Sequence, residues 1–79
     1  MTNVKLGYTD RFSDKVYIMN LVQEDNGWRV NVKYGRRTNV NMRAQYPVGA
    51  PTDDGAARKI FDDLLRKKQA KGYTIESYS

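Results

Sequence analysis

Two neighbouring segments of strictly alternating residues constrain the fold of this chain more than any other feature. From residue 28 to 34, and again from 40 to 46, every second side chain is apolar or aromatic and the residues between are polar. A period of two is typical of a β-strand with one buried face. The apolar positions are Trp28, Val30, Val32 and Tyr34 in the first segment, and Val40, Met42, Ala44 and Tyr46 in the second. The chain therefore predicts a β-hairpin across residues 28–46.

The loop of this hairpin is constrained by the two faces of the sheet. Directly opposed residues project to the same side, so a two-residue loop at Arg36-Arg37 would set apolar residues against polar ones. A register shifted by one position keeps the faces matched. It pairs Val32 with Met42, Val30 with Ala44, and Trp28 with Tyr46. We therefore expect an odd-numbered or bulged loop with residues 36–38 at the tip, in which Gly35 supplies the unusual backbone angles.

Three further strands are expected. Residues 4–9 alternate like the hairpin strands, and residues 16–23 are apolar on both faces over most of their length, which indicates a central strand. Asn26-Gly27 follows, and this dipeptide between two strand-like segments is a strong signal for a second hairpin. A short last strand is expected around residues 73–75.

A helix is expected between the second hairpin strand and the last strand. Thr52 is the predicted N-cap, and Asp53 and Asp54 suit the first turn. The apolar stripe at helical spacing comprises Ala57, Ile60, Phe61, Leu64 and Leu65. The predicted i,i+4 ion pairs are Asp54 with Arg58, Asp62 with Arg66, and Asp63 with Lys67. Gly72 is expected to end the helix.

The predicted fold class is therefore α+β. The element order is ββββ-α-β, with one amphipathic helix packed across one face of an antiparallel sheet and the opposite face in water. A chain of 79 residues is expected to form one domain, residues 1–79.

The composition argues against catalysis. The chain has no cysteine and no histidine, which excludes cysteine nucleophiles, histidine bases and zinc fingers. The aspartate pairs Asp53-Asp54 and Asp62-Asp63 are explained by the helix dipole and by ion pairs. We therefore predict no catalytic residue, no metal and no cofactor. The first residues lack the apolar run of a signal peptide and no stretch suits a membrane span, so a soluble, cytoplasmic protein is expected.

Charge suggests a partner. Lysine and arginine number 14 against 9 acidic residues, giving a net charge of +5. Such a charge indicates either an anionic partner or the ordinary charge that keeps a small domain soluble. The positions of the basic residues along the chain distinguish these two interpretations. No acidic residue lies between Gly27 and Thr52. The basic residues of this stretch are Arg29, Lys33 and Arg43, expected on the solvent-facing side of the strands, and Arg36 and Arg37, expected at the tip. The pattern predicts a nucleic-acid site on the hairpin, with interleaved asparagine and glutamine side chains as hydrogen-bonding groups.

Tyr34 has two interpretations. It either closes the end of the apolar face of its strand as a core tyrosine, or it is an aromatic at the tip that stacks on a sugar or base. The alternating pattern favours the core position.

The residues around the tip resemble a known family. The run from Gly27 to Arg37 resembles the core of the WGR domain, which is named for its Trp-Gly-Arg signature. Such domains continue to a helix like the one expected at residues 57–71, followed by a Gly-Tyr close after a lysine, here Lys71-Gly72-Tyr73. The resemblance covers residues 16–73 and places Tyr34, Gly35 and Arg36 at the signature positions.

This resemblance implies a binding function. WGR domains occur in poly(ADP-ribose) polymerases, where they bind DNA near strand breaks and dock against neighbouring domains, and in bacterial proteins. The signature tryptophan packs on the DNA end and the arginine contacts the backbone. Here Tyr34 replaces that tryptophan, and Thr38 replaces the usual glycine two residues after the arginine. The resemblance thus implies a non-catalytic module that binds DNA rather than RNA, with strand ends or nicks as candidate targets. The alternative is an adaptor that docks a partner enzyme.

Overall fold

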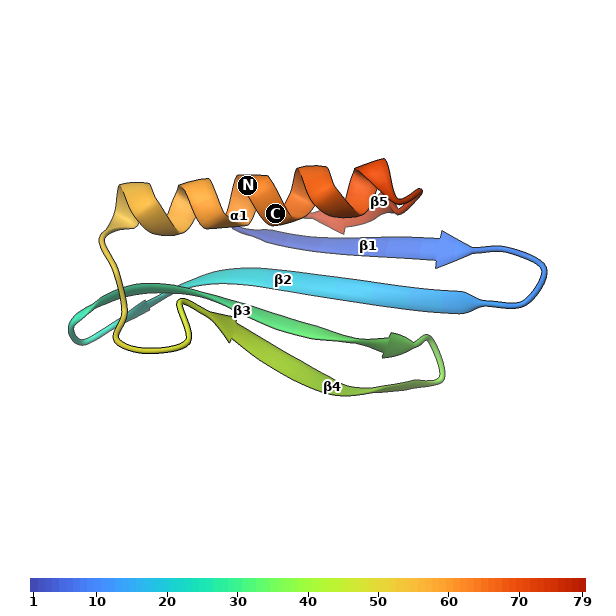
Figure 1. Ribbon diagram of the computed structural model, residues 1–79, viewed down its shortest axis with the longest axis horizontal. Coiled ribbons are helices and arrows are strands. Elements are labelled where there is room, and N and C mark those ends of the chain that lie inside the picture. The colour runs from blue at the N-terminus through green and yellow to red at the C-terminus, as the bar shows by residue number, and fades with distance from the viewer.

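A five-stranded antiparallel sheet carries a single helix across one face (Figure 1). The computed structural model describes all residues from Met1 to Ser79. The elements are β1 (Asn3–Thr9), β2 (Asp14–Glu24), β3 (Gly27–Arg36), β4 (Asn39–Tyr46), α1 (Asp54–Ala70) and β5 (Thr74–Tyr78). The strand order in space is β4-β3-β2-β1-β5, so α1 connects one edge of the sheet to the other. The predicted α+β class and element order are confirmed.

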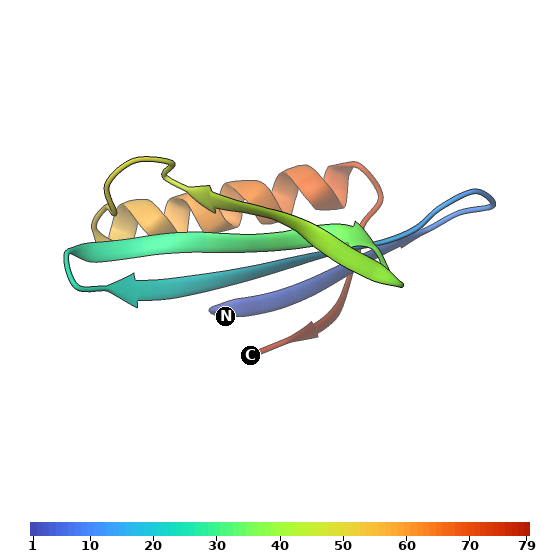
Figure 2. The ribbon, with the colours of Figure 1, turned by 90° about the horizontal axis from the view of Figure 1, so that it is seen from below.

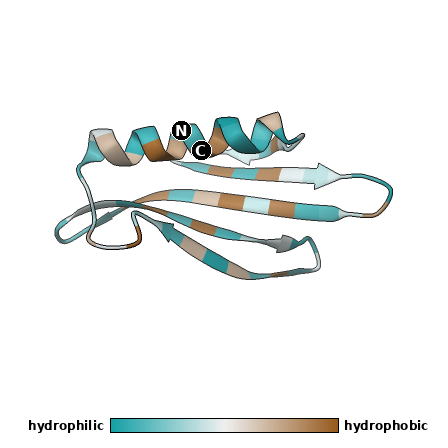
Figure 3. Cartoon of the chain, in the orientation of Figure 1, coloured by the Kyte–Doolittle hydropathy of each residue, from teal (hydrophilic) through white to brown (hydrophobic).

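The core is one apolar layer between α1 and the sheet. Ala57 and Phe61 on the helix are almost fully buried, and Figure 2 shows α1 lying along one side of the strands. The sheet contributes Val4, Leu6, Tyr17, Met19, Leu21, Val30 and Val32 to the same cluster. Apolar and polar residues alternate along the strands and around the helix, which lets each element bury one face (Figure 3). The helix has neither the length nor the apolar run that a membrane crossing needs.

The hairpin between β3 and β4 contains the predicted irregularity but not the predicted register. Val32 opposes Ala44 instead of Met42, so the expected pairing is wrong by two residues. A shift of two leaves every side chain on the same face, so alternation alone cannot distinguish the two registers. The turn is the two-residue pair Arg37-Thr38, and the register shifts between Tyr34 and the end of β3.

Gly35 is the residue that permits this irregularity. Two residues of β4, Val40 and Asn41, stand opposite Gly35 alone, which makes a β-bulge. The φ angle of Gly35 is +148°, and a Cβ there would lie 2.7 Å from the carbonyl oxygen of Asn39. The role expected of Gly35 is confirmed.

The turn between β2 and β3 is displaced from its predicted centre. The two turn residues are Asp25-Asn26, and Gly27 already pairs with Glu24 as the first residue of β3. Of the residues at this turn, only Gly27 takes a positive φ, at +146°, and a Cβ there would also lie 2.5 Å from the carbonyl oxygen of Thr52. The hairpin is confirmed, and its turn lies one residue earlier than expected.

The ends of α1 follow the sequence signals to within one residue. Asp53, not Thr52, is the N-cap, and its carboxylate accepts a hydrogen bond of 2.8 Å from the backbone N–H of Ala56. Thr52 instead forms a bridge with Trp28, with backbone hydrogen bonds of 2.6 and 2.9 Å. Gly72 follows the helix with a φ of +103°, as expected for the residue that ends it.

One of the three predicted ion pairs on α1 is present. Arg58 lies 2.7 Å from Asp54 in the expected i,i+4 arrangement. Arg66 instead pairs with Asp63 at i,i+3, at 3.1 Å, and the pair of Asp63 with Lys67 is absent. Ion pairs on an exposed helix face contribute only a few tenths of a kcal/mol. The preference of Arg66 for Asp62 or Asp63 is therefore weak.

Truncation of the central helix residue tests the apolar layer. Phe61 is 2% exposed. We expect Phe61→Ala to lower the free energy of unfolding by roughly 3–5 kcal/mol, because the lost ring leaves a cavity between helix and sheet. Urea denaturation followed by circular dichroism measures the change. A loss below about 1 kcal/mol would show that the core does not depend on this contact.

Candidate nucleic-acid interface

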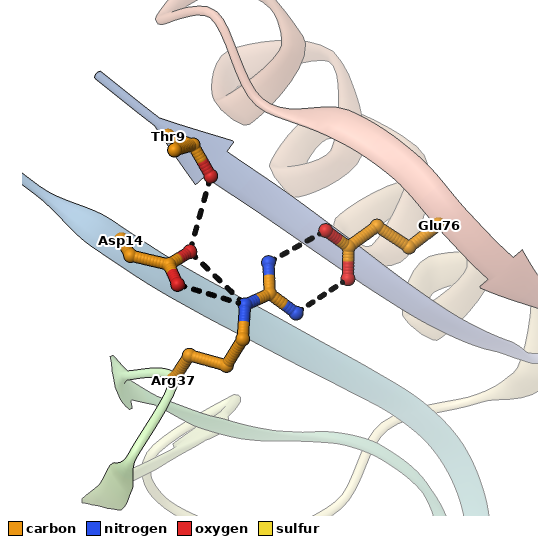
Figure 4. Close-up of polar contacts among 4 residues, drawn as sticks. All are labelled: Thr9, Asp14, Arg37 and Glu76. Carbon is orange, nitrogen blue, oxygen red and sulfur yellow. Dashed lines mark hydrogen bonds and ion pairs between the residues drawn. The ribbon is translucent and has the colours of Figure 1, made fainter. Parts of the chain in front are cut away.

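Arg37 lies back over the face of the sheet that α1 leaves open, here called the open face (Figure 4). Its Nε donates to Asp14 Oδ1 at 3.0 Å, and its Nη1 and Nη2 donate to the two carboxylate oxygens of Glu76 at 2.9 and 2.7 Å. Thr9 donates its hydroxyl to Asp14 at 3.0 Å. The bidentate contact with Glu76 is the stronger geometry for an arginine and a carboxylate. Arg37 therefore joins the hairpin tip to β2 and to β5.

The network rests directly on β1 because of Gly7. A Cβ at Gly7 would lie 1.9 Å from Oε2 of Glu76 and 3.0 Å from Nη2 of Arg37. Hydrogen bonds from the guanidinium lower the pKa of Asp14 and of Glu76. Hydrogen bonds to Glu76, and then to Asp14, raise the pKa of Arg37. Its positive charge is thus matched by carboxylates of the same chain.

Arg29 is buried, which contradicts its expected position in solvent. It is 7% exposed, and its Nε lies 3.0 Å from a carboxylate oxygen of Glu24. Its Nη1 donates to the carbonyl oxygens of Pro47 and Gly49, the latter at 2.9 Å. Alternation predicted the correct face for Arg29 but not the loop after β4 that covers it. Arg29 holds that loop and has no free charge for a ligand.

Lys33 and Arg43 remain unpaired on the open face. They stand directly opposite each other on β3 and β4, both are exposed, and neither makes an ion pair. Together with Asn31 and Gln45 they line a shallow hollow in the sheet surface. Like charges in directly opposed positions destabilise a sheet. These four side chains form what we call the open-face site.

Arg36 belongs to the other side of the sheet. It stands directly opposite Lys15 on β2, and neither residue makes an ion pair. Lys15 projects to the same side as Tyr17, two residues on, whose ring is in the core beneath the helix. The sequence pattern placed Arg36 and Arg37 together as an extension of the open face. In the structure, these neighbours project to opposite faces of the sheet, although both line one pocket at the hairpin tip together with Lys15.

Tyr34 occupies the core position that the alternating pattern favours. It is partly buried, it packs against the core cluster, and its ring centroid lies 5.8 Å from that of Tyr17. Its register partner on β4 is Met42, whose side chain is half exposed. Tyr34 therefore supports the strand end from which Arg36 projects.

Three further cations, of which Lys15 stands opposite Arg36, were not assigned to the site from the sequence. Lys15, Lys68 and Lys71 line one pocket beside the C-terminal end of α1. Lys15 and Arg36 carry the same charge and stand opposite each other. This pairing could have been found only from the correct β2–β3 register, which the sequence does not specify. No group of three or more acidic, cysteine or histidine side chains is placed to hold a metal ion.

Loss of the Arg37 network should be visible as a pH-dependent stability difference. Carboxyl groups with depressed pKa values in the folded state stabilise it above their unfolded values, 3.8 for Asp14 and 4.5 for Glu76, and lose that contribution as the pH falls through the folded values. We expect Arg37→Gln to be less stable than the wild type at neutral pH, with a gap that closes in acid. Urea denaturation at a series of pH values measures the gap.

Arg66→Gln is the matched control for that measurement. It removes the same charge from an exposed i,i+3 pair on α1, 3.1 Å from Asp63, and should change stability little. A gap for Arg37→Gln that stays constant from neutral pH to acid would contradict the role given to the two carboxylates.

The chain as a whole is similar to a known protein family. The family model described as the WGR domain matches residues 2–78. No curated protein and no solved structure matches the chain. The family is a non-catalytic one, associated with nucleic-acid or protein interactions. Since the match spans nearly the whole chain, the protein belongs to the WGR domain family.

Proposed function

We propose that this chain is a DNA-binding module that contacts backbone phosphates through Lys33, Arg43 and Arg36. One observation carries the proposal. Two pairs of like charges, Lys33 with Arg43 and Arg36 with Lys15, stand directly opposite each other without an acidic partner. Each pair costs stability in the free protein, and a polyanion would offset that cost.

The remaining hairpin cations have other roles in this proposal. Arg29 and Arg37 are neutralised by Glu24, Asp14 and Glu76, so they order the surface and make no phosphate contact. This changes the sequence-based expectation that all five basic residues of the hairpin bind DNA.

The other two signature residues, Tyr34 and Gly35, help to position Arg36. Tyr34 packs against Tyr17 and Gly35 permits the bulge, so both set the position of the strand end from which Arg36 projects. Asn31 and Gln45 lie beside the open-face cations, where they can donate hydrogen bonds to phosphates. Arg36, at the end of β3, would contact the DNA backbone, which is the role that the family resemblance gives to the signature arginine, and a strand end or nick remains the candidate target.

Removal of the open-face charges tests the proposal. We expect the double variant Lys33→Gln/Arg43→Gln to bind duplex DNA more weakly. We also expect the slope of log affinity against log salt to fall by about two, because each lost phosphate contact contributes about 0.9. Fluorescence anisotropy with labelled duplex, nicked and single-stranded DNA, between about 50 and 200 mM salt, measures both quantities.

The matched control removes the same charge from the helix. Lys59→Gln/Lys67→Gln changes two exposed lysines of α1 that make no ion pair, and it should leave the salt slope near the wild-type value. Equal slopes for the two double variants would count against the open-face site. Absence of binding by the wild type at high micromolar concentration and low salt would refute DNA binding altogether.

A protein-docking function is the second candidate, and the free edge of β4 favours it. β4 is an outer strand with no neighbour on one side, and Met42 on it is 50% exposed. Such an edge can accept a strand from a partner domain. If the wild type fails to bind DNA at low salt, this edge becomes the leading candidate, and Met42→Lys is the variant expected to block docking.

A further inference from the structure

Four amide side chains stand in register across the open face of the sheet. Asn3 lies opposite Asn20, Asn20 opposite Asn31, and Asn31 opposite Gln45, so the series crosses β1, β2, β3 and β4 in order. Successive residues of a strand project to opposite faces, and the strand neighbours of these four residues face the apolar core. All four amides therefore project away from α1. We call them the amide row.

A parallel row beside it carries positive charge. It lies two residues along each strand from the amide row and comprises Lys5, Ile18, Lys33 and Arg43, which again stand directly opposite one another. We call these four residues the cation row. None of its three basic side chains forms an ion pair. The cation row thus extends the charge of Lys33 and Arg43 across the sheet to β1.

Two shallow hollows of the sheet surface follow these rows. The first is the hollow of the open-face site, between β3 and β4. The second lies over β1 and β2 beside the end of β5, and its lining includes Asn3, Lys5, Ile18 and Asn20. Each hollow therefore combines two amides with at least one unpaired cation. Because Asn20 stands opposite Asn31, the two hollows are neighbours along the amide row.

Most of the amide row has no hydrogen-bond partner within the protein. Asn3 donates to the hydroxyls of Thr2 and Ser79, at 3.4 and 3.2 Å. The side chains of Asn20, Asn31 and Gln45 make no hydrogen bond. Each amide offers both a donor and an acceptor. The two rows together suit a ligand that has negative charges along one side and hydrogen-bonding edges along the other.

A nucleic-acid duplex cannot present its base edges to the amide row. The major groove is about 12 Å wide and admits a helix or a two-stranded ribbon. The amide row crosses four strands, a span of about 14 Å at about 4.8 Å between strands, and the sheet extends further to β5. This face is too wide for either groove, so on a duplex the amides reach only phosphates and sugars. The bases of a single strand are unpaired and accessible.

We propose that the open face binds a single nucleic-acid strand that runs across the β-strands, with its phosphates on the cation row and its base edges on the amide row. The two rows are about 6.6 Å apart, the length of two strand residues, so a phosphate held by Lys33 does not reach Asn31. The group that reaches the amide is the attached sugar or base. The proposal rests on the proposed function, because it needs the phosphate contacts of Lys33 and Arg43, and it adds a preferred form of the ligand.

Affinity for single strands of different base composition tests the amide row. Fluorescence anisotropy is measured with labelled adenine, cytosine and thymine oligonucleotides of equal length, and with a duplex of the same length. We expect the wild type to bind its preferred single strand roughly ten-fold more tightly than the duplex, the effect of one or two additional hydrogen bonds. We also expect the three oligonucleotides to differ in affinity, because amides distinguish the donor and acceptor patterns of the bases.

Asn20→Val/Asn31→Val removes the two central amides. Valine suits a β-strand, and Lys33 and Arg43 are unchanged in this variant. We expect roughly ten-fold weaker binding of the preferred single strand and loss of the difference between bases, while duplex affinity and its salt slope stay at the wild-type values. Gln45→Ala, at an exposed position of the outer strand, should show the same loss to a smaller degree and remains informative if the double variant unfolds.

Gln69→Ala is the matched control for Gln45→Ala. It removes an exposed amide from α1, on the other side of the sheet, and should bind every oligonucleotide as the wild type does. Equal affinity of the wild type for duplex and single strands would overturn the proposal and leave the proposed function standing. So would a double variant that keeps the affinity and the base dependence of the wild type. Failure of the wild type to bind either form would refute both.

The same base sequence prepared as RNA identifies which nucleic acid the open face accepts. The phosphates and base edges are shared by the two polymers, so both should lose affinity in Asn20→Val/Asn31→Val. Binding of the RNA strand more tightly than the DNA strand assigns the face to RNA, and equal or weaker binding assigns it to DNA. An RNA or DNA strand whose affinity is the same for the wild type and the double variant would contradict a role for the amide row.

Discussion

The apolar layer between α1 and one face of the sheet is the constraint on which the rest of the molecule depends. With no cysteine in the chain, Phe61 and the side chains that it meets across the sheet must hold the helix in place. Because successive side chains of a strand point to opposite faces, burying one face of the sheet places every second strand residue on the other face. Arg29, Lys33 and Arg43 therefore have to lie on the open face, whatever their function. What distinguishes them is whether a carboxylate of the same chain is within reach.

That distinction could not be drawn from the sequence. Alternation predicted the correct face for the paired strand residues from Val30 to Tyr34 and from Met42 to Tyr46, and Gly35 correctly indicated a bulge, but the pattern did not separate Arg36 from Arg37. The partners of the arginines lie elsewhere in the chain: Glu24 on the preceding strand for Arg29, and Glu76 close to the C-terminus for Arg37. A contact between residues 37 and 76 requires the spatial strand order, and local patterns carry no information about that order. The register error of two residues has the same origin, since it changes no local preference.

Net charge alone is a poor guide to this surface. The excess of five positive charges counts Arg29 and Arg37 equally with Lys33 and Arg43, although the first two are neutralised within the fold. Most of the electrostatic contribution to binding a polyanion should come from cations that lack an internal partner, because only these are left for the phosphates to neutralise. The structure thus replaces a count of basic residues with a smaller set defined by the absence of ion pairs.

The division of Arg36 from Arg37 has a consequence for the path of a bound chain. Consecutive residues of a strand project in opposite directions, so Arg36 and the open-face site lie on opposite sides of one sheet. A single flat ligand cannot cover both. A nucleic-acid strand that contacts both Arg36 and the open-face site must bend around the hairpin tip or around the outer edge of β4. The thickness of a single sheet then sets the distance between the two contacts along the ligand.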